Sequence, residues 1–252
     1  MNENFIPLLK DRTALVTGAS AGFGRETALL LAKAGAKVIA VARRAEKLQE
    51  LAKEVPLITP LAMDVRASTS EWQAALANQR IDILINNAGL ARGRESFELS
   101  KEDDTDLVFD TNVKALIRLT RVIVPQMLAR EDGDIVNIGS IAGLFTYASG
   151  SIYCASKFAV HALSQAWRQD FLGKNIRVIE ICPGMAETEF SEVRFGDKDR
   201  AKKVYEGLRA LSARDVAESI VWSLSRPRHV NIQNMVIMPT DQSGVGQVHR
   251  RP

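Results

Sequence analysis

The segment "SIYCASKFAV", residues 151–160, carries two proton-bearing side chains in an otherwise apolar helical pattern. Tyr153 and Lys157 are four positions apart, so a helix places them one above the other on one face, close enough to interact. A phenol beside an ammonium is an arrangement suited to acid–base chemistry. The same pair also arises by chance, so its meaning depends on the elements that position it.

A glycine-rich loop, "TGASAGFG" at 17–24, follows an apolar run and opens a helical pattern. In this context Gly18 permits a tight turn, whereas Gly22 and Gly24 permit close approach of the backbone to a pyrophosphate and close packing of the helix. The helix N-terminus then offers unpaired N–H groups to the phosphates. The loop predicts a dinucleotide site, with an ordinary glycine-rich turn as the alternative.

Two arginines follow the next apolar run, in "VIAVARRAEK". An NAD site usually places an acid about 20 residues after the glycine loop, whereas a basic residue accommodates the 2′-phosphate of NADP. Here Arg43 and Arg44 come before the first acid, Glu46. Guanidinium groups bind phosphate oxygens through paired N–H donors, so the sequence favours NADP, and Arg43 more than Arg44 as its ligand. The alternative is a solvated helix start.

Apolar runs of strand length alternate with helical patterns along the chain. Strands that are apolar on both faces are typical of a parallel sheet covered by helices. The repeated order of strand, helix and strand predicts an α/β fold, a Rossmann-type doubly wound parallel sheet of about seven strands with helices on both faces. The expected strands are 13–17, 37–42, 57–63, 81–86, 134–138, 176–182 and 234–238, and the expected helices are 22–34, 44–54, 69–78, 100–129, 152–172 and 213–224.

No linker rich in proline, glycine or serine and no internal repeat divides the chain. We therefore predict a single domain over residues 1–252. An insertion near 184–211 is expected to be irregular, and the tail over 240–252 is expected to be loose.

The composition is that of an ordinary globular protein, with 46% hydrophobic and 25% charged residues. The net charge of +3 comes from 33 basic and 30 acidic residues without a block of like charges, which argues against a nucleic-acid partner. Cys154 and Cys182 are too few for a disulfide framework, and no histidine has companions at metal-ligand spacing, so we expect a reducing compartment and no metal. The chain shows no secretory leader and no apolar run of about 18 residues, which predicts a cytoplasmic protein without a membrane partner.

Three further motifs complete a pattern with the residues above. "NNAG" at 86–89 ends an apolar run, Asn112 lies in "DTNVKAL", and Ser140 precedes Tyr153 by 13 positions. Together with "TGASAGFG", they make residues 10–240 resemble the short-chain dehydrogenase/reductase family. Within that family, "TEFSEVRFGDKDRA" and the C-terminal segment resemble the NADP-dependent 3-hydroxy acid dehydrogenases, also described as serine or allo-threonine 3-dehydrogenases.

The resemblance implies four catalytic residues, Asn112, Ser140, Tyr153 and Lys157. Tyr153 would exchange a proton with the substrate oxygen, and Ser140 would orient that oxygen. Lys157 would bind the ribose hydroxyls, and Asn112 would hold a water in a proton relay. A phenol has a pKa near 10, and a Lys157 ammonium at about 4 Å contributes on the order of 4 kcal/mol, which is enough to lower that pKa by roughly 3 units.

The resemblance also implies the NADP contacts. The residues after the third strand would face the adenine, the "NNAG" motif the adenosine ribose, and the segment after Pro183 the nicotinamide. Asn86 and Pro183 have simpler alternatives, an asparagine that holds backbone turns and a proline that ends a strand. The expected cofactor-binding residues are Gly18, Ser20, Gly22, Phe23, Gly24, Arg43, Arg44, Asp64, Val65, Asn87, Ala88, Gly89, Tyr153, Lys157, Pro183, Gly184 and Thr188.

The expected substrate is a small 3-hydroxy acid of the serine, allo-threonine or 3-hydroxypropionate type. Its carboxylate needs a fixed cation in a site that excludes water. We assign Arg194 to that carboxylate, beside Ser140 and Tyr153 as the other substrate contacts. The alternative is a surface arginine paired with Glu192 or Asp197.

Two other functions stay open. The first is the same enzyme class acting on a bulkier ketone, acyl thioester or sugar, because one fold hosts many substrates. The second is a non-catalytic NADP-binding regulator. The family resemblance further implies a homotetramer formed through the helices expected at 100–129 and 152–172.

Overall fold

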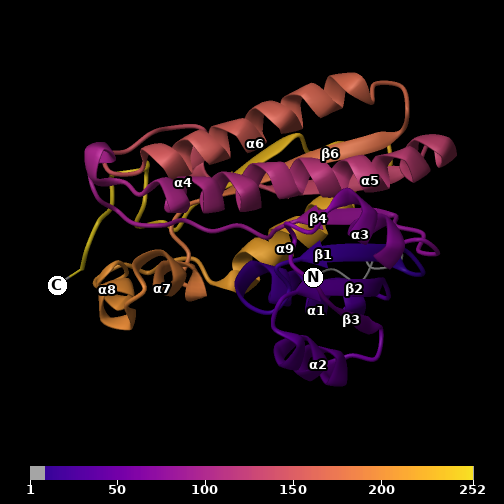
Figure 1. The fold of residues 1–252 in the computed structure, drawn as a ribbon, viewed down its shortest axis with the longest axis horizontal. Coiled ribbons are helices and arrows are strands. Elements are labelled where there is room, and N and C mark those ends of the chain that lie inside the picture. The colour runs from indigo at the N-terminus through magenta and orange to yellow at the C-terminus, as the bar shows by residue number, and fades with distance from the viewer. Residues whose placement is uncertain (1–8, 252) are drawn as a thin grey trace.

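A seven-stranded parallel sheet forms the centre of the molecule in a computed structural model that describes residues 9–251 (Figure 1). The strand order is β3-β2-β1-β4-β5-β6-β7, which confirms the predicted doubly wound α/β fold. The predicted domain limits at residues 1 and 252 lie outside the described residues. The strands are β1 (Thr13–Thr17), β2 (Lys37–Ala42), β3 (Ile58–Ala62), β4 (Ile83–Asn86), β5 (Gly133–Ile138), β6 (Ile176–Pro183) and β7 (Asn234–Ile237).

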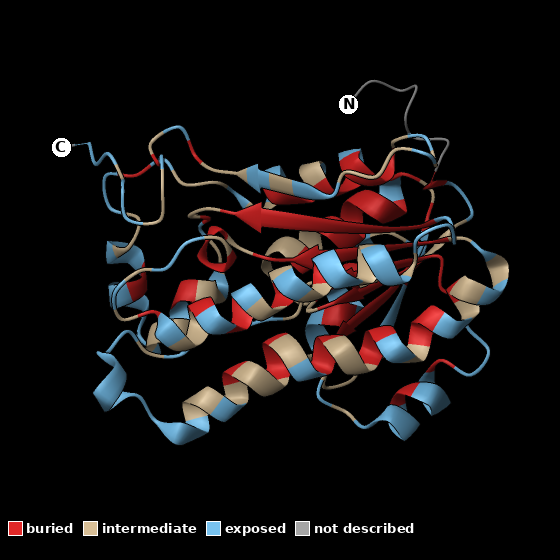
Figure 2. Ribbon diagram, turned by 90° about the horizontal axis from the view of Figure 1, so that it is seen from above, coloured by how far each residue is buried: buried red, intermediate tan, exposed pale blue. Residues whose placement is uncertain are grey.

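Helices cover both faces of this sheet, and their outer surfaces are exposed. The central strands are buried, whereas the edge strands β3 and β7 are partly exposed (Figure 2). Alternation along the strands builds both cores: Val16 and Ile85 pack with α1, α2 and α9, whereas Leu15 and Leu84 pack with α3, α5 and α6. The helices are α1 (Gly22–Lys33), α2 (Ala45–Glu54), α3 (Thr69–Ala75), α4 (Glu102–Phe109), α5 (Ala115–Arg130), α6 (Ser151–Asp170), α7 (Glu189–Phe195), α8 (Lys198–Lys203) and α9 (Ala213–Leu224).

The helix predicted over 100–129 is not one regular helix. A π-helical segment, Asp110–Lys114, separates α4 from α5, and it contains Asn112. A π turn inserts one extra residue into the helical path and is found mostly at functional sites, because it redirects side chains without ending the helix. Apolar periodicity does not reveal such a turn.

The prediction that 184–211 is irregular was wrong, because the segment contains α7 and α8. Thr188 caps α7 by accepting from the N–H of Phe190, and Gly196 ends it at φ +65°. Asp197 then caps α8 by accepting from two backbone N–H groups. The helices are only 7 and 6 residues long, too short to show a helical period in the sequence. Two short 3₁₀ helices, Phe97–Leu99 and Ile141–Gly143, complete the described elements.

The tail after Thr240 is hydrogen-bonded rather than loose. The Arg251 N–H donates to the Gly207 carbonyl at 2.7 Å, and the Arg251 guanidinium donates to Asp241 at 3.0 Å. Gln242 is buried and donates from its amide to the Gly244 carbonyl at 3.1 Å. The bond to Gly207 places the tail against the segment that follows α8, and it joins residues far apart in the sequence, so no local pattern predicted it.

Candidate active site

A cleft of about 700 Å³ opens at the carboxyl edge of the sheet. Its walls come from the segments that follow β1, β2, β3, β4, β5 and β6. The strand order reverses direction between β1 and β4, and ligands of doubly wound sheets bind in the crevice at such a switch point.

Nearly all of the predicted site residues line this cleft; Gly24 and Asn112 do not. Those that do are Gly18, Ser20, Gly22, Phe23, Arg43, Arg44, Asp64, Val65, Asn87, Ala88, Gly89, Ser140, Tyr153, Lys157, Pro183, Gly184, Thr188 and Arg194.

The glycine loop has the backbone that its sequence predicts. Gly18 and Gly22 have φ of +68° and +54°, a region that side chains disfavour. Gly24 serves packing instead, because a Cβ there would collide with the carbonyl oxygen of Gly18. Ala21 begins α1 without a side-chain cap, and the first turn holds no acidic residue. The helix therefore presents its first N–H groups to the cleft as donors for an anion.

Thr17 is a positioning residue that sequence reasoning missed. Its hydroxyl accepts from the N–H groups of Asn87 and Ala88 at 3.0 Å each, and its carbonyl accepts from the Asn87 amide at 2.7 Å. These bonds hold the "NNAG" turn against the glycine loop. Asn86 is buried and donates to the side-chain oxygens of Thr120 and Asn137, so it joins β4 to α5 and β5.

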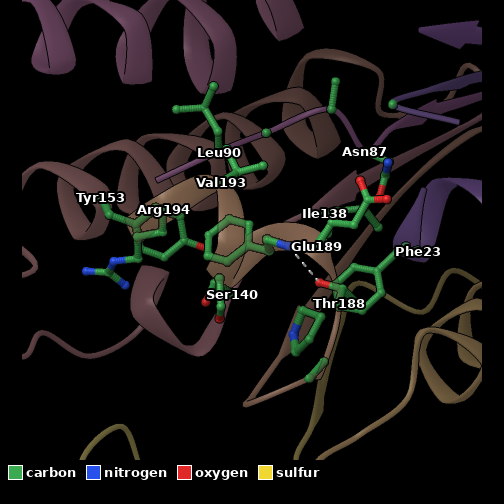
Figure 3. Close-up of a pocket in the computed structure, with 18 of the residues that line it drawn as sticks. Phe23, Asn87, Leu90, Ile138, Ser140, Tyr153, Thr188, Glu189, Val193 and Arg194 are labelled. Carbon is green, nitrogen blue, oxygen red and sulfur yellow. Dashed lines mark hydrogen bonds between the residues drawn. The ribbon is translucent and has the colours of Figure 1, made fainter. Parts of the chain in front are cut away.

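Tyr153, Ser140 and Arg194 lie close together at the end of the cleft away from Phe23 (Figure 3). The Lys157 ammonium is 5.9 Å from the centre of the Tyr153 ring and donates to the Ile138 carbonyl at 2.7 Å. Lys157 is buried, so its charge acts on the cleft with little screening by solvent. The helical spacing thus brings the two proton-bearing groups together as the sequence predicts.

The expected lowering of the Tyr153 pKa was wrong for this structure. Burial raises the pKa of the phenol, and the opposing hydrogen bond to Ser140 and the positive charge of Arg194 do not offset it. Burial also lowers the pKa of Lys157 to about 8, partly offset by Cys182 and Glu180. Desolvation decides both shifts, and the sequence estimate omitted it.

Asn112 lies behind the cleft rather than in its wall. Its side-chain oxygen accepts from the Leu90 N–H at 2.9 Å, and its amide donates to the Leu90 carbonyl at 2.8 Å and to Ser156 at 3.1 Å. A Cβ added at Gly89 would lie 3.2 Å from that oxygen and 3.6 Å from the Lys157 ammonium. Asn112 therefore fixes the segment after β4 against α6, directly behind Lys157.

Arg194 reaches the cleft from α7. Its Nε donates to the Gly93 carbonyl at 2.9 Å and its Nη1 to the Tyr147 hydroxyl at 3.0 Å. The centre of the guanidinium is 5.9 Å from the centre of the Tyr153 ring. Two bonds thus fix the guanidinium beside the phenol.

The alternative of a surface arginine paired with an acid is not what the structure shows. Asp197 uses its carboxylate to cap α8, and Glu192 is exposed. Within residues 9–251, no carboxylate forms a salt bridge with Arg194. Its positive charge is therefore available to a ligand.

The two arginines after β2 differ in their contacts. Arg44 donates from Nε and Nη2 to the Ser20 hydroxyl at 3.1 and 3.0 Å, and from Nη2 to Glu189 at 2.8 Å. Arg43 is exposed at the cleft and has no hydrogen bond to a described residue. Arg43 is therefore the freer of the two, in agreement with the order of preference from the sequence.

Residues 12–199 match the family model described as short chain dehydrogenase. The chain belongs to the short-chain dehydrogenase family. The recognition of that family from sequence motifs is thereby confirmed, and this short-chain dehydrogenase spans nearly the full length of the relatives it matches.

The relatives agree with the subgroup recognised from the sequence. The chain is 44% identical to the NADP-dependent 3-hydroxy acid dehydrogenase YdfG of Escherichia coli (strain K12), over 94% of this chain and 99% of that one. It is 42% identical to a probable NADP-dependent dehydrogenase of Haemophilus influenzae, over 94% and 97%. A closed form of serine dehydrogenase complexed with NADP+ superposes with a TM-score of 0.90 at 42% identity, over 95% of this chain and 100% of that one.

The described residues contain neither a cluster of metal-ligating side chains nor a membrane-spanning helix. Among residues 9–251, no group of three or more histidine, cysteine, aspartate or glutamate side chains is placed to hold a metal ion. Within the same residues, no helix has both the length and the apolar character needed to cross a bilayer.

Proposed function

We propose that this short-chain dehydrogenase is an NADP-dependent oxidoreductase that interconverts small 3-hydroxy acids and the corresponding 3-oxo acids. The substrate class is inferred from the position of Arg194. Its guanidinium lies beside Tyr153 and has no carboxylate partner among the described residues. The names of the relatives, a 3-hydroxy acid dehydrogenase and a serine dehydrogenase, support the same class.

The cleft fits NADP. The uncapped start of α1 and the left-handed Gly18 and Gly22 suit a pyrophosphate, and Arg43 and Arg44 at the end of β2 suit a 2′-phosphate. Asp64 and Val65 would lie against the adenine, and the other lining residues predicted from sequence would make the remaining contacts. When bound, NADP takes up or supplies the hydride at its nicotinamide ring.

The protein's own part of the reaction is the movement of one proton at the substrate oxygen. Tyr153, kept protonated by burial, donates its phenolic proton to that oxygen during reduction. In oxidation the phenol must first ionise, and the positive charges of Lys157 and Arg194, each 5.9 Å from the ring centre, favour the phenolate. Ser140 donates to the substrate oxygen and orients it, and Asn112 holds the backbone behind Lys157.

The substrate carboxylate would pair with Arg194. Arg92 and Arg94 also line the cleft and come from the segment that contacts α7, through the bond from Arg92 to the Val193 carbonyl at 2.7 Å. This end of the cleft is therefore cationic, which favours an anionic substrate over a neutral ketone. A guanidinium already fixed by two bonds loses little freedom when it binds a carboxylate.

The test compares a 3-hydroxy acid with its methyl ester in wild-type protein and in Arg194→Met. The methionine keeps the packing of the aliphatic stem and removes the charge. We expect kcat/KM for the acid to fall about a hundredfold, or about 3 kcal/mol, while the ester changes little. Parallel losses for the two compounds would make Arg194 structural and would favour the bulkier-ketone alternative.

We propose that the protein works in the cytoplasm on a small-molecule substrate. We also propose a homotetramer, with contacts through α4, α5 and α6. Light scattering of the purified protein measures the assembly directly, and a monomer would contradict this proposal.

A further inference from the structure

A fully buried carboxylate, Glu180, lies inside the fold in a part of β6 that the proposed reaction does not use. Its Oε2 accepts from His161 Nδ1 at 2.7 Å and from the Asn234 amide at 3.1 Å. Gln165 donates to the other ring nitrogen of His161 at 2.7 Å, so Nδ1 carries the ring proton and donates to Glu180. Glu180 and His161 are 19 positions apart, so their spacing in the sequence does not pair them, and strand and helix meet only in the fold.

The second oxygen of Glu180 has no nitrogen or oxygen partner among the described residues, and the only hydrogen bond to the carboxylate beyond those above is from the neighbouring Cys182 thiol. It lies against Gly139, since a Cβ added there would be 2.5 Å from Oε1 and 3.0 Å from the Cys182 sulfur. Gly139 directly follows Ile138, whose carbonyl accepts from the Lys157 ammonium at 2.7 Å. The carboxylate is therefore behind the backbone to which Lys157 is bonded.

An unpartnered buried carboxylate oxygen is costly unless a nearby positive charge compensates for it. The ionisable groups around it are Lys157, His161 and Arg168 from α6 and Cys182 from β6. Burial and the charge of Glu180 raise the pKa of the Cys182 thiol to about 12, so this thiol is neutral at neutral pH. Glu180 is then the negative charge of the group.

We propose that Glu180 is a positioning residue whose buried negative charge, held by His161, keeps the Lys157 ammonium charged against the Ile138 carbonyl. This inference rests on the proposed role of Lys157 in proton transfer and ribose binding. Burial alone drives Lys157 toward its neutral form, and neutral Lys157 neither favours the phenolate of Tyr153 nor binds hydroxyls as a cation. Glu180 opposes that tendency without touching substrate or cofactor.

The test is Glu180→Gln, which keeps the shape of the side chain and removes its charge. The pKa of Lys157 is about 8, so activity that needs its ammonium is lost as pH rises through that value. Without the carboxylate we expect this alkaline limb of kcat/KM to move down by about one pH unit. Glu180→Asp keeps the charge, so its alkaline limb should lie close to the wild-type position. Glu218→Gln removes an exposed carboxylate on α9 and is the matched control, for which the limb should not move.

A binding measurement separates this inference from turnover. Calorimetry with NADP should give a Kd for Glu180→Gln about three- to tenfold weaker near pH 8.5 and close to wild type near pH 6.5. If Glu180→Gln does not fold, Glu180→Leu tests the same charge, since it also removes the carboxylate and should move the limb in the same direction.

The outcomes distinguish two failures. An alkaline limb and NADP affinity that stay at wild-type values in Glu180→Gln, or in Glu180→Leu if only that variant folds, overturn the role of Glu180. Wild-type kcat in Lys157→Met would instead overturn the assignment of Lys157 in the proposed function.

Discussion

Removal of the Arg43 guanidinium should reduce the discrimination between NADP and NAD. Arg43 lines the cleft at the end of β2 and has no hydrogen bond to a described residue, so Arg43→Ala disturbs little else. A charge-assisted hydrogen bond to a phosphate is worth about 1.5–3 kcal/mol. Because Arg43 is exposed, solvent screening places the expected loss near the lower end, about 1.5 kcal/mol. That corresponds to a Kd for NADP about tenfold weaker.

The existing contacts of Arg44 make its expected contribution to NADP affinity smaller than that of Arg43. The Arg44 guanidinium already donates to the Ser20 hydroxyl and forms a salt bridge with Glu189. That salt bridge is exposed and is worth about 0–1 kcal/mol. A phosphate would have to displace Glu189 from Arg44, so Arg44→Ala should weaken NADP less than Arg43→Ala does. Contact with the 2′-phosphate is unique to NADP, so the affinity for NAD should change less than about twofold in both variants.

The assay is titration calorimetry of the free protein with NADP, NAD and adenosine 2′,5′-bisphosphate. Lys47→Ala, which removes an exposed positive charge from α2 outside the cleft, is the matched control. Equal weakening of NADP and NAD by Arg43→Ala would refute the reasoning, and so would an unchanged Kd for the bisphosphate.

Three other predictions follow from particular contacts. Tyr153→Phe keeps the ring and its packing against Phe190, so it should fold and bind NADP but lose at least about a hundredfold in kcat; activity above a few per cent of wild type would contradict the assignment. Glu189→Gln releases Arg44 and should tighten NADP about two- to fivefold by calorimetry, whereas weaker binding would show that the salt bridge helps to hold the cofactor. Asp134→Asn should cost about 3–5 kcal/mol in urea unfolding, because it leaves the buried Arg177 and the half-buried Arg12 and Arg228 without their carboxylate. Burial opposes ionisation of Asp134, but Arg177, Arg12 and Arg228 keep its pKa below 3.8, so its stabilisation is full above that value and is lost as pH falls through the folded pKa. The urea unfolding midpoint of the wild type should therefore fall more steeply with acid than that of Asp134→Asn. Equal falls in the two proteins would contradict this.

The fold was predictable because the buried strands of a parallel sheet appear in the sequence as continuous apolar runs. β1 and β2 have the bounds that their runs predict, and the helices on both faces follow from the alternation with strands. The sequence could not show the π turn at Asn112, which leaves the apolar pattern unchanged. Nor could it show α7 and α8, which are held by caps and by contacts far along the chain rather than by a period.

The site was predictable as a set of residues but less so in its energetics. Tyr153, Ser140 and Lys157 meet as their spacing and motifs indicate. The pKa of Tyr153 went in the opposite direction because a pairwise charge estimate omits desolvation, which depends on the final burial. The pairing of Glu180 with His161 joins β6 to α6, and only the packed structure places them together.

The proposed activity of this cleft is the oxidation of small 3-hydroxy acids with NADP. The direct measurement is the rate of NADPH formation with serine, allo-threonine and 3-hydroxypropionate, compared with their methyl esters and with cyclic alcohols, each with NADP and with NAD. We expect kcat/KM values with NADP that are about a hundredfold higher for the acids than for the neutral compounds. Turnover of cyclic alcohols without turnover of the acids, or equal use of NAD, would contradict it.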